Sequence, residues 1–253
     1  MKLIISDTSL YSLSEDTRVP KEYLAQLKNY GQCEIYITPY DTIIITLPTR
    51  TLPVSHLIEE NWVAPTPYGN VRNVFLVEQL IDGTQTNLFI KSPERLFTSN
   101  QILLGKKDFW WGGRRSGEKP LLIQNNPAIE EQGFWEAIFL LELAKNKIKA
   151  EIPQAILITN PIEYRVIVER IERGLVIKGP GLQEITSSIQ KLGIIPVDLS
   201  YYNIVPDRDG YIHIIDTNRW YWPPYTDAFI QKIFETIRAA TLPEKIQNYN
   251  INL

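Results

Sequence analysis

The chain has 253 residues, 44% hydrophobic and 11% aromatic, so it is long and apolar enough to bury a sizeable core. Its formal net charge of −3 argues against a general attraction to nucleic acid or to a membrane surface. The single cysteine, Cys33, excludes an internal disulfide framework, and two histidines without a glycine-flanked serine make a Ser-His-Asp hydrolase a poor fit. No apolar run approaches the length of a membrane span and the first residues do not resemble a cleavable signal, so we expect a cytoplasmic protein without a membrane partner.

The first sixty residues predict one short helix followed by two strands. The helix is expected near residues 20–28, and the strands at 34–38 and 42–47 flank the turn Pro39-Tyr40-Asp41. An independent domain is less expected at this length than a cap. We therefore expect residues 1–60 to pack as an N-terminal cap on the part of the chain that follows.

A second pair of strands is predicted at residues 74–80 and 88–91, joined by the turn Asp82-Gly83. The second of these strands is apolar and ends in Lys91. A lysine in this position can point into a cleft, although a surface lysine at a strand end would give the same pattern.

An insertion at about residues 92–128 separates this strand from the next helix. Its centre, residues 105–119, carries five basic and two acidic residues around three aromatics. Cations beside aromatic rings suit an anionic or planar ligand, nucleic acid included. Two alternatives stay open: a solvated loop whose tryptophans pack on the fold, and a glycine-hinged lid.

A helix is predicted from about residue 129 to 147, because apolar residues recur there at the spacing of one helical face. Glu136 lies in the first third of this helix, where it could also be an ordinary solvated residue. Two strands are then expected at residues 152–158 and 164–171, followed by a short amphipathic helix at 182–192 that a glycine ends.

A third hairpin brings three polar residues together. Residues 204–205 and 211–215 are apolar and β-branched, and a turn-forming stretch joins them. Asn203 enters the first strand and Asp216 leaves the second, so we expect them side by side, with Asp198 on the loop just before. Amide and carboxylate oxygens suit Mg²⁺, which keeps water or phosphate as its other ligands. Asp198 and Asn203 could instead be turn-capping residues.

The pattern Asp198-Leu-x-x-x-Asn203, followed by a hairpin and Asp216, resembles the catalytic and magnesium loops of protein kinases and their relatives. The Leu-Phe-Ile-Lys end of the second hairpin resembles the kinase strand whose lysine pairs with nucleotide phosphates. By element order the resemblance covers roughly residues 62 to 230. The segment at residues 185–205 is similar to the atypical kinases of the Rio type and of the tRNA-modifying KEOPS complex, and to aminoglycoside phosphotransferases.

The resemblance implies a role for each matching residue. Asp198 would be the catalytic base, and Asn203 and Asp216 would hold Mg²⁺. Lys91 would contact the phosphates of ATP and pair with Glu136. Gly69 would belong to the loop that covers the phosphates.

Several departures from the kinase pattern make a conventional protein kinase a poor match. Pro196-Val197-Asp198 replaces His-Arg-Asp, and Asp216-Thr217-Asn218 replaces Asp-Phe-Gly. The glycine-rich loop is reduced to the single Gly69 within residues 68–72. Only 37 residues follow Asp216, too few for an activation segment and a full helical lobe.

The resemblance implies an α+β chain with a bilobal, protein kinase-like fold. Residues 61–170 would form a β-rich N-lobe, and residues 171–253 a reduced helical C-lobe. The expected function is ATP- and Mg²⁺-dependent phosphoryl transfer to an unknown small-molecule or macromolecular acceptor. The alternative is an inactive kinase-fold protein, a pseudokinase, that binds a nucleotide or a partner.

An aromatic segment follows the third hairpin. Residues 219–225 hold four aromatics and two prolines, which cannot continue a helix. We expect this segment either to pack in the small C-terminal lobe or to form a wall for the acceptor.

Overall fold

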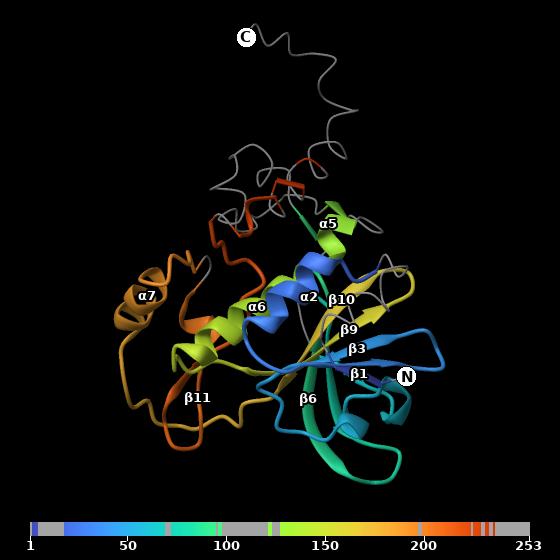
Figure 1. Cartoon of the computed structure of the whole chain (residues 1–253). Coiled ribbons are helices and arrows are strands. Elements are labelled where there is room, and N and C mark those ends of the chain that lie inside the picture. Colours follow the sequence, from blue (N-terminus) through green and yellow to red (C-terminus); the bar gives the residue numbers. More distant parts are fainter. Residues whose placement is uncertain are drawn as a thin grey trace, which may run out of the picture.

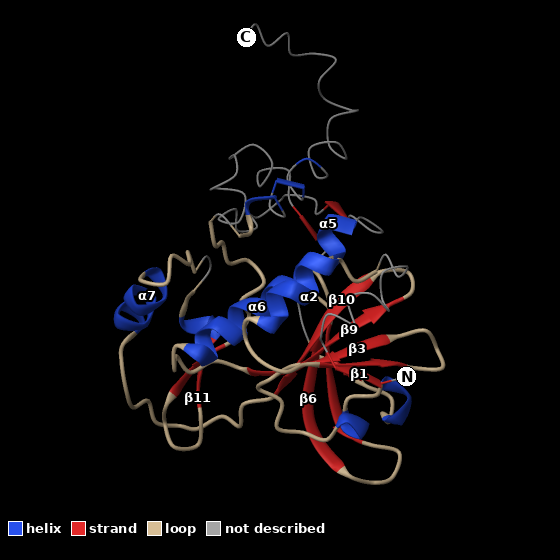
Figure 2. Ribbon diagram, in the orientation of Figure 1, coloured by secondary structure: helices blue, strands red, loops and turns tan. Residues whose placement is uncertain are grey.

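The computed structural model describes residues 2–4, 18–68, 72–94, 96–97, 121–122, 127–196, 199–223, 225–228, 231–232 and 235. The fold is α+β, as the sequence predicts, with helices packed on one large antiparallel sheet (Figures 1 and 2). Within the described ranges, no helix combines the length and apolarity needed to cross a membrane.

The helices are α2 (Lys21–Lys28), α5 (Pro127–Glu130), α6 (Gln132–Lys145) and α7 (Leu182–Gln190). The strands of the large sheet are β1 (Lys2–Ile4), β2 (Glu34–Ile37), β3 (Ile43–Thr46), β4 (Thr66–Pro67), β5 (Val74–Gln79), β6 (Gln85–Lys91), β9 (Ile152–Thr159) and β10 (Glu163–Glu169). Two short pairs complete the described strands: β7 (Leu96–Phe97) with β8 (Leu121–Leu122), and β11 (Ile204–Pro206) with β12 (Ile212–Ile214).

The large sheet runs in the order β1-β2-β3-β9-β10-β6-β5-β4, and every neighbouring pair is antiparallel. The predicted cap strands are part of this sheet, because β3 pairs with β9 from Ile43 opposite Ile158 to Thr46 opposite Ala155. The division of the chain into cap, N-lobe and C-lobe stays a prediction.

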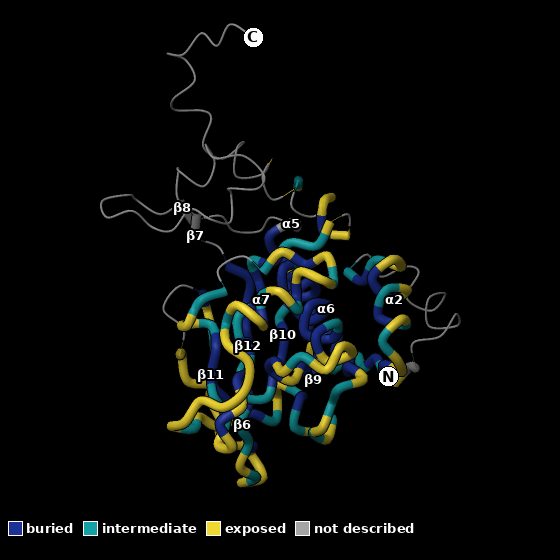
Figure 3. Tube along the Cα trace, turned by 90° about the vertical axis from the view of Figure 1, so that its left-hand side faces the viewer, coloured by how far each residue is buried: buried dark blue, intermediate teal, exposed yellow. Residues whose placement is uncertain are grey.

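Both faces of the central strands are buried because their side chains alternate between two hydrophobic clusters. Ile156 and Ile158 of β9 join the core beneath α2 and α6. The intervening Leu157 faces the opposite cluster, where Leu57 and Trp62 from two 3₁₀ turns cover the sheet. Figure 3 shows the resulting concentration of buried residues in α6 and the strands beside it.

The β11–β12 hairpin lies beside the start of β9. Backbone bonds join Ile214 to both Lys149 and Glu151, at 3.1 and 2.9 Å. Trp220, in the aromatic segment after the hairpin, is buried against Phe139 of α6, with ring centroids 5.9 Å apart. This packing fixes the chain after β12 relative to α6 and to the start of β9.

Candidate functional site

Lys91 ends the central strand β6, where Val74 of β5 and Val166 of β10 flank it in register. Its side chain is only 6% exposed and lies between two carboxylates. The Nζ atom is 3.5 Å from Oε1 of Glu136 and forms a short ion pair with Oε2 of Glu151. The predicted pairing of Lys91 with Glu136 is therefore present, with Glu151 as the closer partner.

Glu136 is fixed by the close packing of α6 against β10. A β-carbon at Gly133, one helical turn earlier, would overlap the backbone carbonyl of Tyr164, so the helix approaches the strand as closely as only glycine permits. The Glu136 side chain has no exposed surface. It therefore acts on other site residues rather than on solvent.

Arg72 lies two residues before β5 and is closer to Glu136 than Lys91 is. Its Nη2 donates to both carboxylate oxygens, at 2.8 and 3.0 Å. Its Nε lies 3.7 Å from Oδ1 of Asp216, an ion pair longer than a hydrogen bond. The guanidinium of Arg72 thus stands between two of the predicted site residues.

Asp216 directly follows the β11–β12 hairpin in a left-handed backbone conformation, with φ of 60°. Its backbone N–H donates to Oε2 of Glu151 at 3.3 Å. The side chain is 41% exposed, yet its Oδ1 is buried and accepts no hydrogen bond from any described residue. Asp216 therefore forms the open side of the cluster.

Asn203 lies opposite Ile215, the residue before Asp216, because the hairpin forms where it is predicted. The backbone N–H of Ile215 donates to the carbonyl of Asn203 at 2.9 Å. The structure therefore brings Lys91, Glu136, Asn203 and Asp216 into one region. Asp198, Gly69 and the 105–119 segment lie outside the described residues.

Electrostatics favour a charged Asp216. Burial opposes its ionisation, but the positive charges of Arg72, Lys91 and Arg219 outweigh burial and hold its pKa below the ordinary value. Burial also disfavours the charged form of Lys91 and would lower its pKa. The negative charges of Glu151 and Glu136 outweigh burial and raise the pKa above its ordinary value. Burial raises the pKa of Glu151 despite Lys91.

A second ion pair, between Glu94 and Arg219, holds the chain segments next to the cluster in place. Glu94 accepts hydrogen bonds from Arg219 at 2.5 and 2.9 Å and from Asn218 at 3.4 Å. The amide of Gln132 bonds to the backbone N–H and carbonyl of Glu94. These contacts fasten the chain after Asp216 to the end of β6 and the start of α6.

Four further residues around the site have no role in the predicted kinase motifs: Arg72, Glu94, Glu151 and Arg219. Arg72 ends residues 68–72, where the reduced glycine-rich loop is predicted, and a cation at that position is a sequence signal for phosphate binding. Glu151 precedes β9 and resembles a surface residue at a strand end, because no periodicity marks a carboxylate that turns inward. Only the three-dimensional structure reveals that it partners Lys91.

The oxygen atoms of the cluster fit a metal ion that is coordinated partly by the protein and partly by a bound phosphate and water. They do not form a site in which protein side chains supply all the ligands. Within the described residues, no three or more His, Cys, Asp and Glu side chains are grouped to hold a metal ion. In the cluster of Arg72, Lys91, Glu136, Glu151 and Asp216, carboxylates outnumber cations by one, and Oδ1 of Asp216 lacks a donor. A cation that takes its remaining ligands from phosphate and water fits that arrangement.

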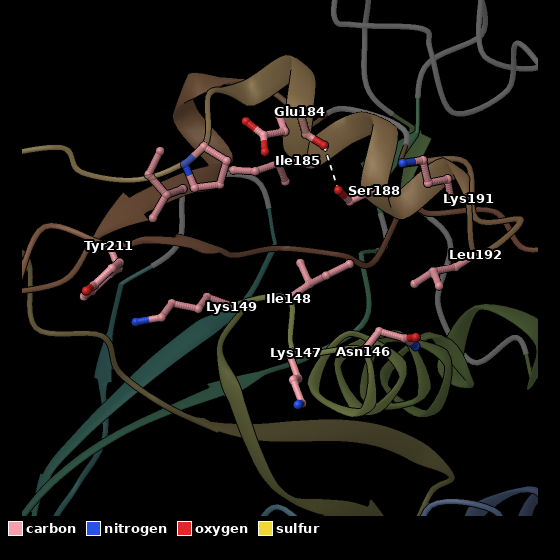
Figure 4. A pocket seen from close by; sticks show the side chains of 12 residues that line it. Asn146, Lys147, Ile148, Lys149, Glu184, Ile185, Ser188, Lys191, Leu192 and Tyr211 are labelled. Atoms are coloured by element: carbon pink, nitrogen blue, oxygen red, sulfur yellow. Dashed lines mark hydrogen bonds between the residues drawn. The ribbon is translucent and has the colours of Figure 1, made fainter.

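A separate cavity of about 540 Å³ lies between the end of α6, α7 and β12 (Figure 4). Ile148, Ile185 and Leu192 supply apolar surface, and Lys149 and Lys191 lie toward opposite ends. The ammonium of Lys149 is already engaged, 3.7 Å from the centroid of the Tyr211 ring. The cavity does not include the buried cluster around Lys91.

No family model matches the chain, and no curated protein does. Among solved structures, the chain is similar to the complex of Rv3197 with erythromycin from Mycobacterium tuberculosis, with 16% sequence identity and a TM-score of 0.36. The match covers 87% of this chain and 61% of that one, so this chain spans about three fifths of that protein's length. A likeness this weak carries no argument about function, and the resemblance to kinases stays a prediction.

Proposed function

We propose that the protein is an ATP- and Mg²⁺-dependent phosphotransferase with a reduced, bilobal kinase-like fold. The observation that carries this proposal is the buried Lys91–Glu136 ion pair facing a half-exposed Asp216. These residues come from the end of a central strand, an adjacent helix and the exit of a hairpin, in the order that the sequence resemblance implies. The acceptor is a small molecule or macromolecule of unspecified chemistry.

In this proposal the cluster recognises phosphates by charge and position. Lys91 binds phosphate oxygens, and Asp216 together with Asn203 would hold Mg²⁺. When bound, Mg²⁺ would neutralise negative charge on the phosphate oxygens. Asp198 would orient or deprotonate the acceptor hydroxyl.

The same cluster also supports a second candidate function, that of a kinase-fold protein that binds nucleotide without transferring phosphate. The observation in favour of it is that Glu151 already neutralises Lys91. A nucleotide phosphate would have to compete with this buried carboxylate. The two candidates differ in turnover, not in the site that they use.

Nucleotide binding is tested by thermal-shift titration with ATP, with and without Mg²⁺, since a ligand that binds only the folded state raises the apparent melting temperature. We expect stabilisation at millimolar Mg-ATP. Asp216→Asn should remove the Mg²⁺-dependent part of the shift, and Lys91→Met should weaken the response to ATP. Lys149→Met is the matched control, because Lys149 lies outside the cluster.

Phosphotransfer is tested separately by following ATP consumption. Asp198→Ala should lower turnover much more than it lowers nucleotide affinity. Binding of Mg-ATP with no turnover above that of Asp198→Ala would favour the second candidate. The absence of any shift with ATP or Mg²⁺ would overturn both candidates.

A further inference from the structure

The predicted phosphate-covering loop is poor in the groups that normally perform that task. Glycine-rich loops bind phosphates through backbone N–H groups that only glycines let approach closely. Residues 68–72 contain a single glycine and end in Arg72. If the chain binds a nucleotide, other donors must supply what this loop lacks.

Arg72 has suitable donors in a suitable place. A guanidinium carries five N–H donors, and the hydrogen bonds of Arg72 to described residues use Nη2 alone, both to Glu136. Its Nε is directed at the half-exposed Asp216 across 3.7 Å without forming a hydrogen bond. The donors on Nε and Nη1 therefore have no acceptor among the described residues.

The remaining contacts of Arg72 pre-organise it. Its side chain is 6% exposed, and both carboxylate oxygens of Glu136 accept hydrogen bonds from Nη2 on one edge of the planar guanidinium. Glu136 is itself held by the packing of α6 on β10. A guanidinium fixed on one edge loses little freedom when the other edge meets an anion, and its fork matches phosphate geometry.

We propose that Arg72 is a phosphate-binding residue that acts beside Lys91 and replaces the backbone donors of the missing glycines. Glu136 is then a positioning residue that orients two cations toward the terminal phosphates of ATP. This inference rests on the proposed function, and it adds a recognition residue at the end of the reduced loop, to which the resemblance to kinases assigns no role.

The test must separate phosphate binding from simple neutralisation of Glu136. Arg72→Gln alone would leave Glu136 short of a buried partner and could unfold the protein. We therefore compare Arg72→Gln/Glu136→Gln with Glu136→Gln, so that both proteins lack the carboxylate and differ only in Arg72, whose Nη2 can still donate to the remaining amide oxygen at position 136 in the reference variant. Calorimetric titrations use Mg-ATP, adenosine and inorganic tripolyphosphate as probes.

We expect the double variant to bind Mg-ATP and tripolyphosphate about 10- to 100-fold more weakly than Glu136→Gln, the range for loss of a charge-assisted contact. Adenosine, which has no phosphate, should bind both equally. Arg72→Lys, which keeps the charge but loses the fork, serves where the glutamine variants fail to fold and should show an intermediate loss. Arg165→Gln is the control, because Arg165 pairs with Glu163 and Glu59 instead.

The outcomes distinguish this inference from the function on which it rests. If the wild type binds Mg-ATP but the double variant and Glu136→Gln bind it equally, and Arg72→Lys matches the wild type, Arg72 is only a counter-ion and the proposed function stands. If the wild type binds neither Mg-ATP nor tripolyphosphate, both are wrong. Equal weakening of adenosine and ATP would show a change in the fold and would overturn the inference.

Discussion

Lys91 and Glu151 lie 60 positions apart in the sequence and form an ion pair in which neither side chain is more than 6% exposed. Glu151 also accepts the backbone N–H of Asp216. One carboxylate therefore connects the end of β6, the start of β9 and the exit of the β11–β12 hairpin.

The two glutamates of the cluster should differ in what they contribute to stability. Glu136 pairs with both Arg72 and Lys91, and its loss leaves the buried Arg72 without a hydrogen-bonded carboxylate, whereas Lys91 keeps Glu151. We expect Glu136→Gln to lower the free energy of unfolding by about 3–5 kcal/mol. Glu151→Gln should cost less, about 1–3 kcal/mol, because Lys91 keeps Glu136 and the amide oxygen can still accept from Asp216.

Urea denaturation of both variants at neutral pH measures these costs. An equal or larger loss for Glu151→Gln would show that Glu151, and not Glu136, is the main partner of the buried cations.

Gly133 should be intolerant of any side chain. A methyl group there meets the carbonyl of Tyr164, so Gly133→Ala must push α6 away from β10. We expect a loss of about 1–3 kcal/mol, typical of overpacking, together with weaker nucleotide binding because Glu136 is carried on the same helix. Gly181→Ala is the control, since a methyl group at Gly181 meets nothing within 4 Å.

Denaturant unfolding and ATP binding are measured for both Gly133→Ala and Gly181→Ala. Stability of Gly133→Ala equal to that of Gly181→Ala would mean that the helix can shift without strain.

Replacing Lys147 with glycine should stabilise the protein, whereas replacing the glycine at position 133 should destabilise it. It occupies the left-handed position after α6, with φ of 59°, and the bonds from Lys147 to Ala144 and from Ile148 to Leu143 form a Schellman cap. Glycine is favoured there because it has no β-carbon. We expect Lys147→Gly to raise the free energy of unfolding by about 0.5–1 kcal/mol.

The matched variant is Lys145→Gly, at the last residue of α6, where right-handed helix is required. It should lower stability by about 1 kcal/mol. The same sign for both substitutions would contradict the assignment of the cap.

Acid stability should depend on Asp207 of the β11–β12 turn. Slight burial opposes its ionisation, but a 2.8 Å bond to His213, the backbone N–H of Tyr211 and the charge of Lys149 lower its pKa from 3.8 to about 2. A carboxyl whose pKa is lower in the folded state contributes stability above its unfolded value of 3.8. That contribution is lost as the pH falls toward 2.

Asp207→Asn should therefore lose less stability than the wild type between pH 4 and pH 2, in urea titrations at matched ionic strength. Parallel curves for the two proteins over this range would show that the contacts of Asp207 with His213, Tyr211 and Lys149 do not stabilise the folded state.

The sequence predicted local elements well because their signals are local. Apolar spacing located α6, and turn formers between β-branched runs located the β11–β12 hairpin that sets Asn203 beside Asp216. Pairing between distant segments could not be predicted in this way, because it leaves no local signal in the sequence. Nothing in residues 42–47 indicates that β3 pairs with β9, and nothing around Glu151 indicates that it turns toward Lys91.

The pairing of β3 with β9 also has a consequence during synthesis of the chain. All four residues of β3, Ile43–Thr46, are buried in the finished sheet, but their partner strand leaves the ribosome much later. Until then the hairpin of β2 and β3 has an open apolar edge, which is the kind of edge that other chains can join. Chaperone binding to nascent chains of increasing length should therefore persist until β9 has emerged, and should then decline.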